Sequence, residues 1–268
     1  MHATDAPWCQ PCWPVPARVR ALLTTRGSLP AHGASAPPRQ YFNLGDHVGD
    51  DAAAVAANRQ RLHLQGMAGA RPVFMNQVHG TGVLTLQTHT PDGATADAAA
   101  TALPHLACTV MVADCLPVLL ANTAGTAVAA AHAGWRGLAA GVLERTVQAL
   151  QSLDSSHPPP GIVAWLGPCI GPEAFEVGGE VREAFVASDA GAAGCFTPQS
   201  QGKYLANLPA LARRRLAALG VCSVHGNDGT PAWCTVVQPE RFFSYRRDQL
   251  RQGATGRMAA CVWLDDTL

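Results

Sequence analysis

The sequence predicts an α/β domain of the α+β type, built on a mixed sheet. Short apolar runs with strand character alternate with segments of helical periodicity. Several of the expected strands follow one another without a helix between them, which a purely parallel sheet does not allow. No GxGxxG or Walker-type loop follows a strand, so the doubly wound nucleotide-binding folds are excluded. With 268 residues, 48% hydrophobic and 14% charged, the chain can bury a large core within one domain.

The first half of the chain divides into a short lead-in and a regular part. Residues 1–17 are rich in proline and predict an irregular lead-in, so the domain proper is expected over 18–268. Cys9 and Cys12 have CxxC spacing, but no second pair follows at zinc-ribbon distance, which favours an incidental pair. The elements expected next, in order, are a strand over 19–25, a loop over 28–40, a helix over 50–65 with Asp51 as N-cap, and strands over 73–75 and 83–86.

The second half continues with strands that break at small or turn-forming residues. A buried strand over 106–112 is interrupted at Asp114 and Cys115 and resumes over 118–120. The strand over 127–131 ends on His132 and leads into an amphipathic helix over 138–153. The remaining elements are predicted as a strand over 162–166, helices over 173–187 and 203–219, with Gly220 closing the second, and a strand over 258–264.

Three residues that can bind a soft metal stand where apolar runs give way to turns: His79, Cys115 and His132. Two imidazoles and one thiolate with a fourth position open are the ligand set of a catalytic zinc rather than of a structural one. Each residue taken alone fits other roles as well, because free cysteine is often a buried core residue and a histidine can be a satisfied polar group.

The residues around two of these ligands have chemical uses of their own. Gly134 and Gly137 bracket Trp135 and Arg136 at an expected helix start, where backbone N–H groups and a guanidinium can bind an anion. Asp114 precedes the thiol, where a carboxylate can orient a ligand or carry a proton.

Composition limits the classes of partner. The chain has 19 basic and 19 acidic residues, which argues against a nucleic-acid or anionic-membrane surface. No segment reads as a membrane span or a secretory signal. Nine irregularly spaced cysteines indicate free thiols in a reducing compartment. We therefore expect a cytoplasmic protein, a monomer or weak homodimer, that binds a small molecule.

Four motifs together resemble the laccase-domain family, also called multicopper polyphenol oxidoreductase and, more recently, purine nucleoside phosphorylase. They are QVHG at 77–80, ADCLPVLL at 113–120, AHAGWRG at 131–137 and GPCIGP at 167–172. Shorter matches occur in order at 24–26, 43–45, 47–51, 175–178, 243–247 and 255–259, so the resemblance runs from about residue 18 to the C-terminus.

The resemblance implies a fold, a ligand set and activities. The fold is a four-layer α/β/β/α arrangement similar to cysteine-dependent toxin deamidases. The ligands are His79, Cys115 and His132, usually holding zinc, with copper as an alternative occupant. The activities are phosphorolysis of adenosine, inosine and methylthioadenosine, and deamination of adenosine. For some bacterial members the family also implies editing of peptidoglycan precursors.

Each reaction suggests further site residues. Phosphorolysis needs an anion site, for which Arg136 is the first candidate and Arg26 and Arg59 are others, all in or near matched motifs. Asn43 and Gln77 are expected to contact the substrate. Deamination needs a carboxylate or imidazole to move protons, and Asp114 and Asp97 are the carboxylates available; the signature of the nucleobase deaminases is absent.

Two alternatives use the same three residues. In a cysteine-dependent hydrolase or amidase, Cys115 is the nucleophile and His132 its base, and a peptidoglycan precursor is the substrate. In a copper-dependent phenol oxidase the set imitates a blue-copper site. A multicopper enzyme also needs His-x-His pairs, of which the chain has none, so the oxidase is the weaker alternative.

Overall fold

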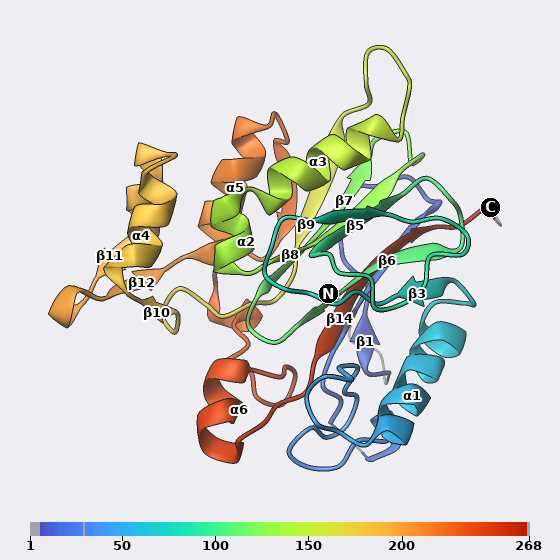
Figure 1. The fold of residues 1–268 in the computed structure, drawn as a ribbon, viewed down its shortest axis with the longest axis horizontal. Coiled ribbons are helices and arrows are strands. Elements are labelled where there is room, and N and C mark those ends of the chain that lie inside the picture. Colours follow the sequence, from blue (N-terminus) through green and yellow to red (C-terminus); the bar gives the residue numbers. More distant parts are fainter. Residues whose placement is uncertain (1–5, 29, 267–268) are drawn as a thin grey trace.

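Two β-sheets packed face to face form the centre of the protein, with helices on both outer faces. The structure is a computed structural model and describes residues 6–28 and 30–266. Figure 1 shows α2, α3 and α5 over the larger sheet and α1 beside the smaller one. This is the mixed α/β fold, in four layers, that the sequence predicts.

The smaller sheet has five strands in the order β1-β2-β14-β6-β3. The first four pair antiparallel, whereas β3 runs parallel to β6. The strands are β1 (Trp8–Cys9), β2 (Val19–Thr24), β14 (Met258–Leu264), β6 (Leu106–Val112) and β3 (Arg71–Val73).

The larger sheet has six strands in the order β13-β9-β7-β8-β5-β4, parallel at both edges and antiparallel in the middle. The strands are β13 (Ser223–Gly226), β9 (Ile162–Leu166), β7 (Leu116–Asn122), β8 (Val128–Ala133), β5 (Ala98–Thr101) and β4 (Val83–Thr85). A separate antiparallel sheet contains β10 (Glu176–Val177), β12 (Tyr204–Ala206) and β11 (Phe196–Pro198).

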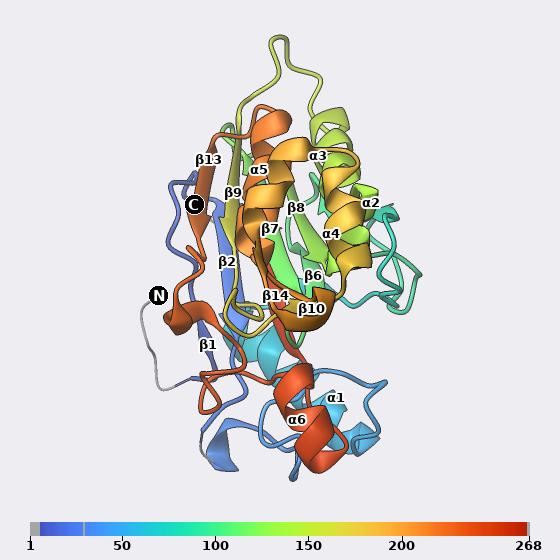
Figure 2. The same cartoon turned by 90° about the vertical axis from the view of Figure 1, so that its left-hand side faces the viewer.

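The helices fall into two groups. The elements α2 to α5 gather along the larger sheet, while α1 and α6 lie at the opposite end of the view in Figure 2. The helices are α1 (Ala52–Arg61), α2 (Trp135–Ala140), α3 (Val142–Ser152), α4 (Gly179–Val186), α5 (Leu208–Ala218) and α6 (Tyr245–Gln252). Short 3₁₀ or π turns cover Pro30–His32, Leu62–Gly66, Ala190–Cys195, Ser200–Gly202 and Pro231–Trp233. No helix in the described ranges has the length and apolarity to cross a membrane.

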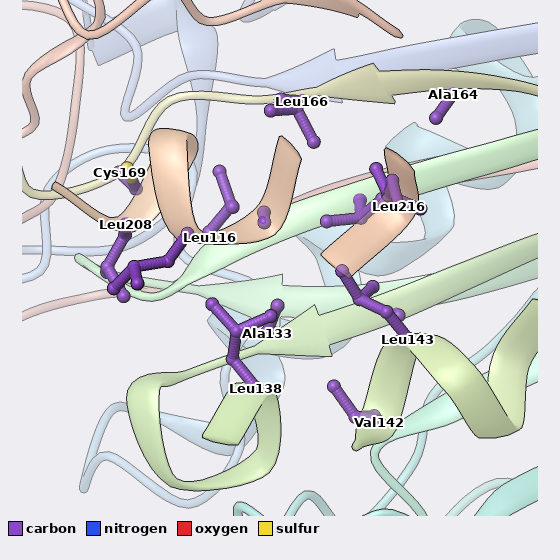
Figure 3. Close-up of a cluster of buried hydrophobic side chains, with 14 of the residues drawn as sticks. Leu116, Ala133, Leu138, Val142, Leu143, Ala164, Leu166, Cys169, Leu208 and Leu216 are labelled. Atoms are coloured by element: carbon purple, nitrogen blue, oxygen red, sulfur yellow. The ribbon is translucent and has the colours of Figure 1, made fainter. Parts of the chain in front are cut away.

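Strand periodicity assigns each side chain to one of three core layers. In β7, Leu119 and Ala121 face the smaller sheet, whereas Leu116, Val118 and Leu120 face the helices. Figure 3 shows the helix-side layer, in which leucines and valines from α2, α3 and α5 pack on the strands of the larger sheet. Because both faces of the central strands are buried, these strands read as continuous apolar runs rather than as alternating ones.

Several predicted elements are confirmed and others needed correction. The strands over 106–112, 162–166 and 258–264 are found with those bounds. The single helix expected over 138–153 is two, because Gly141 adopts a left-handed φ of 99° that ends α2. The helices expected to begin at 173 and 203 begin later, since each is preceded by a strand of the small third sheet and then by Gly178 or Asn207 as N-cap.

The N-terminal lead-in is not wholly irregular, because Trp8 and Cys9 pair with β2. The Cys9 thiol is buried against the Leu23 carbonyl, and burial raises its pKa to about 11. Cys12 is exposed. These settings agree with an incidental CxxC pair.

Candidate metal centre

The pairing of β7, β8 and β5 brings Cys115, His132 and Asp97 together. The β7–β8 register pairs Leu116 with Ala133, so Cys115 lies opposite Gly134 and diagonal to His132. The β5–β8 register pairs Ala98 with Ala131, so Asp97 lies opposite His132. The backbone N–H of His132 donates to the Asp97 carbonyl at 2.7 Å. The ligand cluster is therefore fixed by strand register at one end of the larger sheet.

His79 reaches the same place from a loop that follows β3. Its φ of 61° is left-handed, a conformation uncommon outside glycine and one that redirects the chain. The buried Asp97 carboxylate accepts the N–H groups of Val78, His79 and Gly80 at 3.2, 2.9 and 2.6 Å. One side chain thus holds the loop that presents the first ligand.

The same carboxylate also orients the second histidine. Asp97 Oδ1 lies 2.8 Å from Nδ1 of His132, so Nε2 of that ring is the nitrogen left for a ligand. A metal-binding histidine usually has such a carboxylate on its other nitrogen. The arrangement therefore suits a metal ligand better than an isolated core histidine.

The donor atoms fit a zinc ion. The ligand atoms of His79, Cys115 and His132 all lie within 4.8 Å of one another. Nε2 of His79 is 3.6 Å from Sγ of Cys115, and tetrahedral zinc with usual bond lengths separates a nitrogen and a sulfur ligand by ~3.6 Å. The imidazole rings meet edge to face, with centroids 4.8 Å apart. The three residues can hold a metal and leave one position for a further ligand.

Electrostatics favour the thiolate that a metal requires. Burial alone would raise the pKa of the Cys115 thiol, but the charge of His132 and hydrogen bonds from both histidines outweigh it and lower that pKa to about 6. Burial opposes a charge on His132, yet Cys115 and Asp97 raise its pKa to about 9. These shifts favour a thiolate beside an imidazolium, and a metal ion that binds there would take the place of that proton.

Two glycines leave room for this cluster. A Cβ on Gly134 would lie 2.8 Å from Cδ2 of His79 and 3.1 Å from Sγ of Cys115. A Cβ on Gly137 would lie 2.7 Å from the carbonyl oxygen of Gly80. The glycines of the AHAGWRG motif thus allow close approach of the ligands and of the His79 loop.

The ligands open onto a cavity of about 400 Å³, within the range usual for small-molecule sites. One part of its wall is apolar and aromatic, from Trp135, Ile170, Phe175 and Leu208, with Tyr245 beside them. Another part carries positive charge from Arg246 and Arg257, and His47 lies in the same lining. The cavity combines a flat apolar surface, positive charge and the donor cluster.

Gln77 and Asp114 line this cavity, but their polar atoms are already engaged. The Gln77 amide donates to the Met111 carbonyl at 2.8 Å and accepts the Met111 N–H at 2.7 Å. Asp114, at a φ of 86°, accepts hydrogen bonds from the Thr235 hydroxyl and from the N–H of Arg246 in the first turn of α6. Both residues therefore position the wall of the site.

Four other expected site residues lie outside the lining of this cavity. Arg136 is exposed and stacks on Trp135, with 4.4 Å from guanidinium to ring centroid. Arg26 donates to the Pro239 carbonyl, and Asn43 is fully buried and accepts the N–H of Arg257. Arg59 lines a second, smaller cavity. Arg136 therefore lies outside this cavity, whereas Arg246 and Arg257 line it.

These two arginines, and His47 and Tyr245 beside them, were not predicted as site residues from the sequence. His47, Tyr245, Arg246 and Arg257 all stand in short segments that match the family. These matches could have marked them as candidates. The sequence does not show, however, that the loop at 47, α6 and the start of β14 meet around His79.

The fold and the site define a mixed α/β protein in which a candidate three-ligand metal centre opens onto a cavity of small-molecule size. Residues 20–265 match the family described as multi-copper polyphenol oxidoreductase laccase. The chain belongs to this family.

Similar proteins span the whole domain. A Pseudomonas aeruginosa protein named purine nucleoside phosphorylase PA4543 is 49% identical over 260 residues, covering 97% of this chain and 99% of that protein. The purine nucleoside phosphorylase YfiH of Escherichia coli is 50% identical over 254 residues, covering 95% and 97%. The crystal structure of Neisseria meningitidis protein NMB0706 superposes with a TM-score of 0.84 at 46% identity, covering 97% and 99%.

Proposed function

We propose that this protein is a zinc-dependent purine nucleoside phosphorylase acting on adenosine, inosine and methylthioadenosine, with adenosine deamination as a second activity. The observation that carries the proposal is one cavity lined by an aromatic surface, two arginines and the His79, Cys115 and His132 cluster. The printed names of similar proteins agree with this reaction class.

Phosphorolysis needs a bound phosphate next to the ribose. The reaction forms a bond from a phosphate oxygen to C1′ and breaks the bond from C1′ to the base nitrogen, whose electron pair leaves with the base and takes up a proton. Arg257 is the arginine we assign to the phosphate, with Arg246 beside it. The Arg257 guanidinium is largely shielded from water, and burial lowers its pKa below the usual range of an arginine. A shielded guanidinium binds a phosphate more strongly than an exposed one, because water competes less.

The purine base needs a flat apolar surface. Trp135 and Phe175 supply aromatic rings in the part of the wall built from α2 and the segment before β10, and Leu208 adds an aliphatic contact from α5. Binding the base there leaves the ribose near the donor cluster. Arg136 stacks on the outer side of this wall through Trp135.

The donor cluster is the remaining part of the proposal. A zinc ion held by its three ligands would supply a Lewis acid with one open coordination position. Asp97 keeps His132 in the tautomer that presents Nε2, and Gly134 keeps His79 and Cys115 close. Asp97 and Asp114 are engaged in hydrogen bonds with other residues. We therefore assign both carboxylates positioning roles and place deamination second to phosphorolysis.

A phosphate-dependent assay tests the proposal. The purified protein should contain about one zinc per chain and release adenine from adenosine only when phosphate is present. His79→Ala and Cys115→Ala should lose both zinc and turnover while keeping the unfolding temperature within a few degrees. Base release without phosphate would indicate hydrolysis, and ammonia release from adenosine reports deamination.

A second candidate function is a cysteine-dependent hydrolase. It is supported by the chain of contacts that runs from Asp97 through His132 to Cys115. An acid holds the imidazole, and the imidazole contacts the thiol, which is the order of groups in a cysteine-hydrolase triad. A peptidoglycan precursor is the substrate that the family resemblance suggests. Chelation separates the candidates, because it should abolish a zinc-dependent reaction and leave a thiol-dependent one intact.

The proposed setting is the cytoplasm, with a purine nucleoside and phosphate as partners. All nine cysteines are free thiols, which fits a reducing compartment. We propose a monomer or weak homodimer that binds neither nucleic acid nor membrane.

A further inference from the structure

A second cavity of about 280 Å³ lies next to the first, and His47, Gln77 and Met111 line both. The partition between them includes the Gln77 side chain, which is fixed by its two hydrogen bonds to Met111. Phosphate, ribose and base are all accommodated in the first cavity, so the proposed reaction leaves the second without a role.

The second cavity has one cation with unused donors. The Nε of Arg59 donates to the Leu44 carbonyl at 2.9 Å, and its Nη2 lies 3.2 Å from Oδ2 of Asp46. The guanidinium is 4.0 Å from the centroid of the Phe74 ring, which fixes its plane. Within 6–28 and 30–266 no residue bonds Nη1, so two N–H groups can meet a ligand carboxylate.

The second cavity also contains a negatively charged side chain, Asp92. Asp92 lines the cavity, and its Oδ1 accepts the N–H of Phe74 at 2.9 Å, while no other residue of the described chain bonds its Oδ2. Between the charged groups the wall is apolar, from Phe74, Met75 and Met111. This combination suits a short methylene or thioether chain that ends in an amino acid, with its carboxylate toward Arg59 and its ammonium toward Asp92.

We infer that the second cavity binds a substituent on C5′ of the nucleoside, and that the substrate class includes 5′-thioether nucleosides whose tail ends in an amino-acid group. The inference rests on the proposed function for the orientation of the nucleoside. A base on Trp135 and Phe175 and a ribose at the donor cluster direct C5′ away from the aromatic wall. Gln77 and Met111 line both cavities, so a C5′ substituent that passes them would enter the second one.

The test compares three nucleosides that differ only at C5′: adenosine, methylthioadenosine and S-adenosylhomocysteine. Binding is measured by calorimetry on the zinc-loaded protein without phosphate, and kcat/KM is measured with phosphate. S-adenosylhomocysteine should bind at least about tenfold more tightly than methylthioadenosine, which is what one charge-assisted hydrogen bond supplies.

Two variants locate the tail. Arg59→Met should remove that tenfold advantage and leave the ratio of methylthioadenosine to adenosine as in the parent. Asn76→Trp adds bulk in the same cavity from an exposed position whose side chain donates to the Thr95 hydroxyl, and it should also remove the advantage. Arg145→Met, which removes an exposed guanidinium on α3, is the matched control, and thermal unfolding checks each variant.

Three outcomes overturn the inference: no tail advantage in the parent, a tail advantage that survives both variants, or an equal loss for all three nucleosides. The last would place the base in the second cavity. Failure of phosphorolysis with every nucleoside is a separate result, because it refutes the proposed function while the binding ratios still decide whether the tail occupies this cavity.

Discussion

Gly134 offers the sharpest test of the metal centre, because its replacement changes space without straining the backbone. Gly134 has φ −62° and ψ 153°, which alanine adopts readily. A Cβ there would lie 2.8 Å from Cδ2 of His79 and 3.1 Å from Sγ of Cys115. Gly134→Ala therefore perturbs two ligands with one methyl group.

The expected size of the effect follows from these distances. Two carbon atoms pack at about 3.5–4.0 Å, so the His79 ring must move by about 0.7 Å or more. Zinc–ligand distances tolerate about 0.2 Å. A displacement several times that tolerance should weaken zinc binding by about 100-fold, the upper range for loss of a group that orients a ligand.

Competition with a chromogenic chelator measures the zinc affinity, and adenosine phosphorolysis measures turnover at saturating zinc. Gly194→Ala is the control, since a Cβ at Gly194 meets nothing within 4 Å. The unfolding temperature of the zinc-free Gly134→Ala protein should stay close to that of the parent. Unchanged zinc affinity in this variant would refute the reasoning, because the ligands would then not converge around Gly134.

Three further predictions concern two residues of the site and Asp248 in the first turn of α6. Asp97→Asn should weaken zinc by about 10–100-fold in the same competition assay, and an unchanged affinity would show that His132 needs no carboxylate partner. Arg257→Gln should raise KM for phosphate by about tenfold or more, and the same change at Arg136 should have the smaller effect; the reverse order would return the phosphate to Arg136. Burial opposes ionisation of the Asp248 carboxylate. Hydrogen bonds from Arg247, Ser244 and Thr255 outweigh burial and hold its pKa below 3.8. This stabilisation is fully present above 3.8 and is lost as pH falls through the lower folded-state pKa. Asp248→Asn should therefore cost about 3 kcal/mol in urea unfolding at neutral pH and less at an acidic pH below 3.8. Equal costs at both pH values would contradict it.

The long apolar strands were predictable, and the alanine strand was not. Buried runs such as 106–112 and 258–264 carry enough β-branched and large residues to identify them. β5 consists of Ala98, Ala99, Ala100 and Thr101, and alanine favours helix when it is isolated. It forms a strand here because it pairs with the equally small residues of β8. That partner lies thirty residues away, so local propensity cannot report it.

The same pairing explains which part of the site the sequence could identify. His79, Cys115 and His132 stand in recognisable motifs, and the structure brings their ligand atoms within 4.8 Å. Asp97 was identified only as an available carboxylate, because its position opposite His132 depends on the β5–β8 register. Arg257 could likewise not be predicted as a site residue, because its place in the wall of the first cavity depends on how β14 enters the smaller sheet.

Asp97 links the fold to the chemistry more directly than the ligands do. It directly precedes β5, and it bonds His132 across the strand pair through both its backbone and its side chain. It also accepts three N–H groups of the loop that carries His79. An aspartate buried to this degree is stable only when its charge is fully hydrogen-bonded, so the loop, the strand end and the imidazole must be in place together. The proposed metal centre is therefore assembled by the folding of the larger sheet, and we expect zinc binding to require little rearrangement of the described chain.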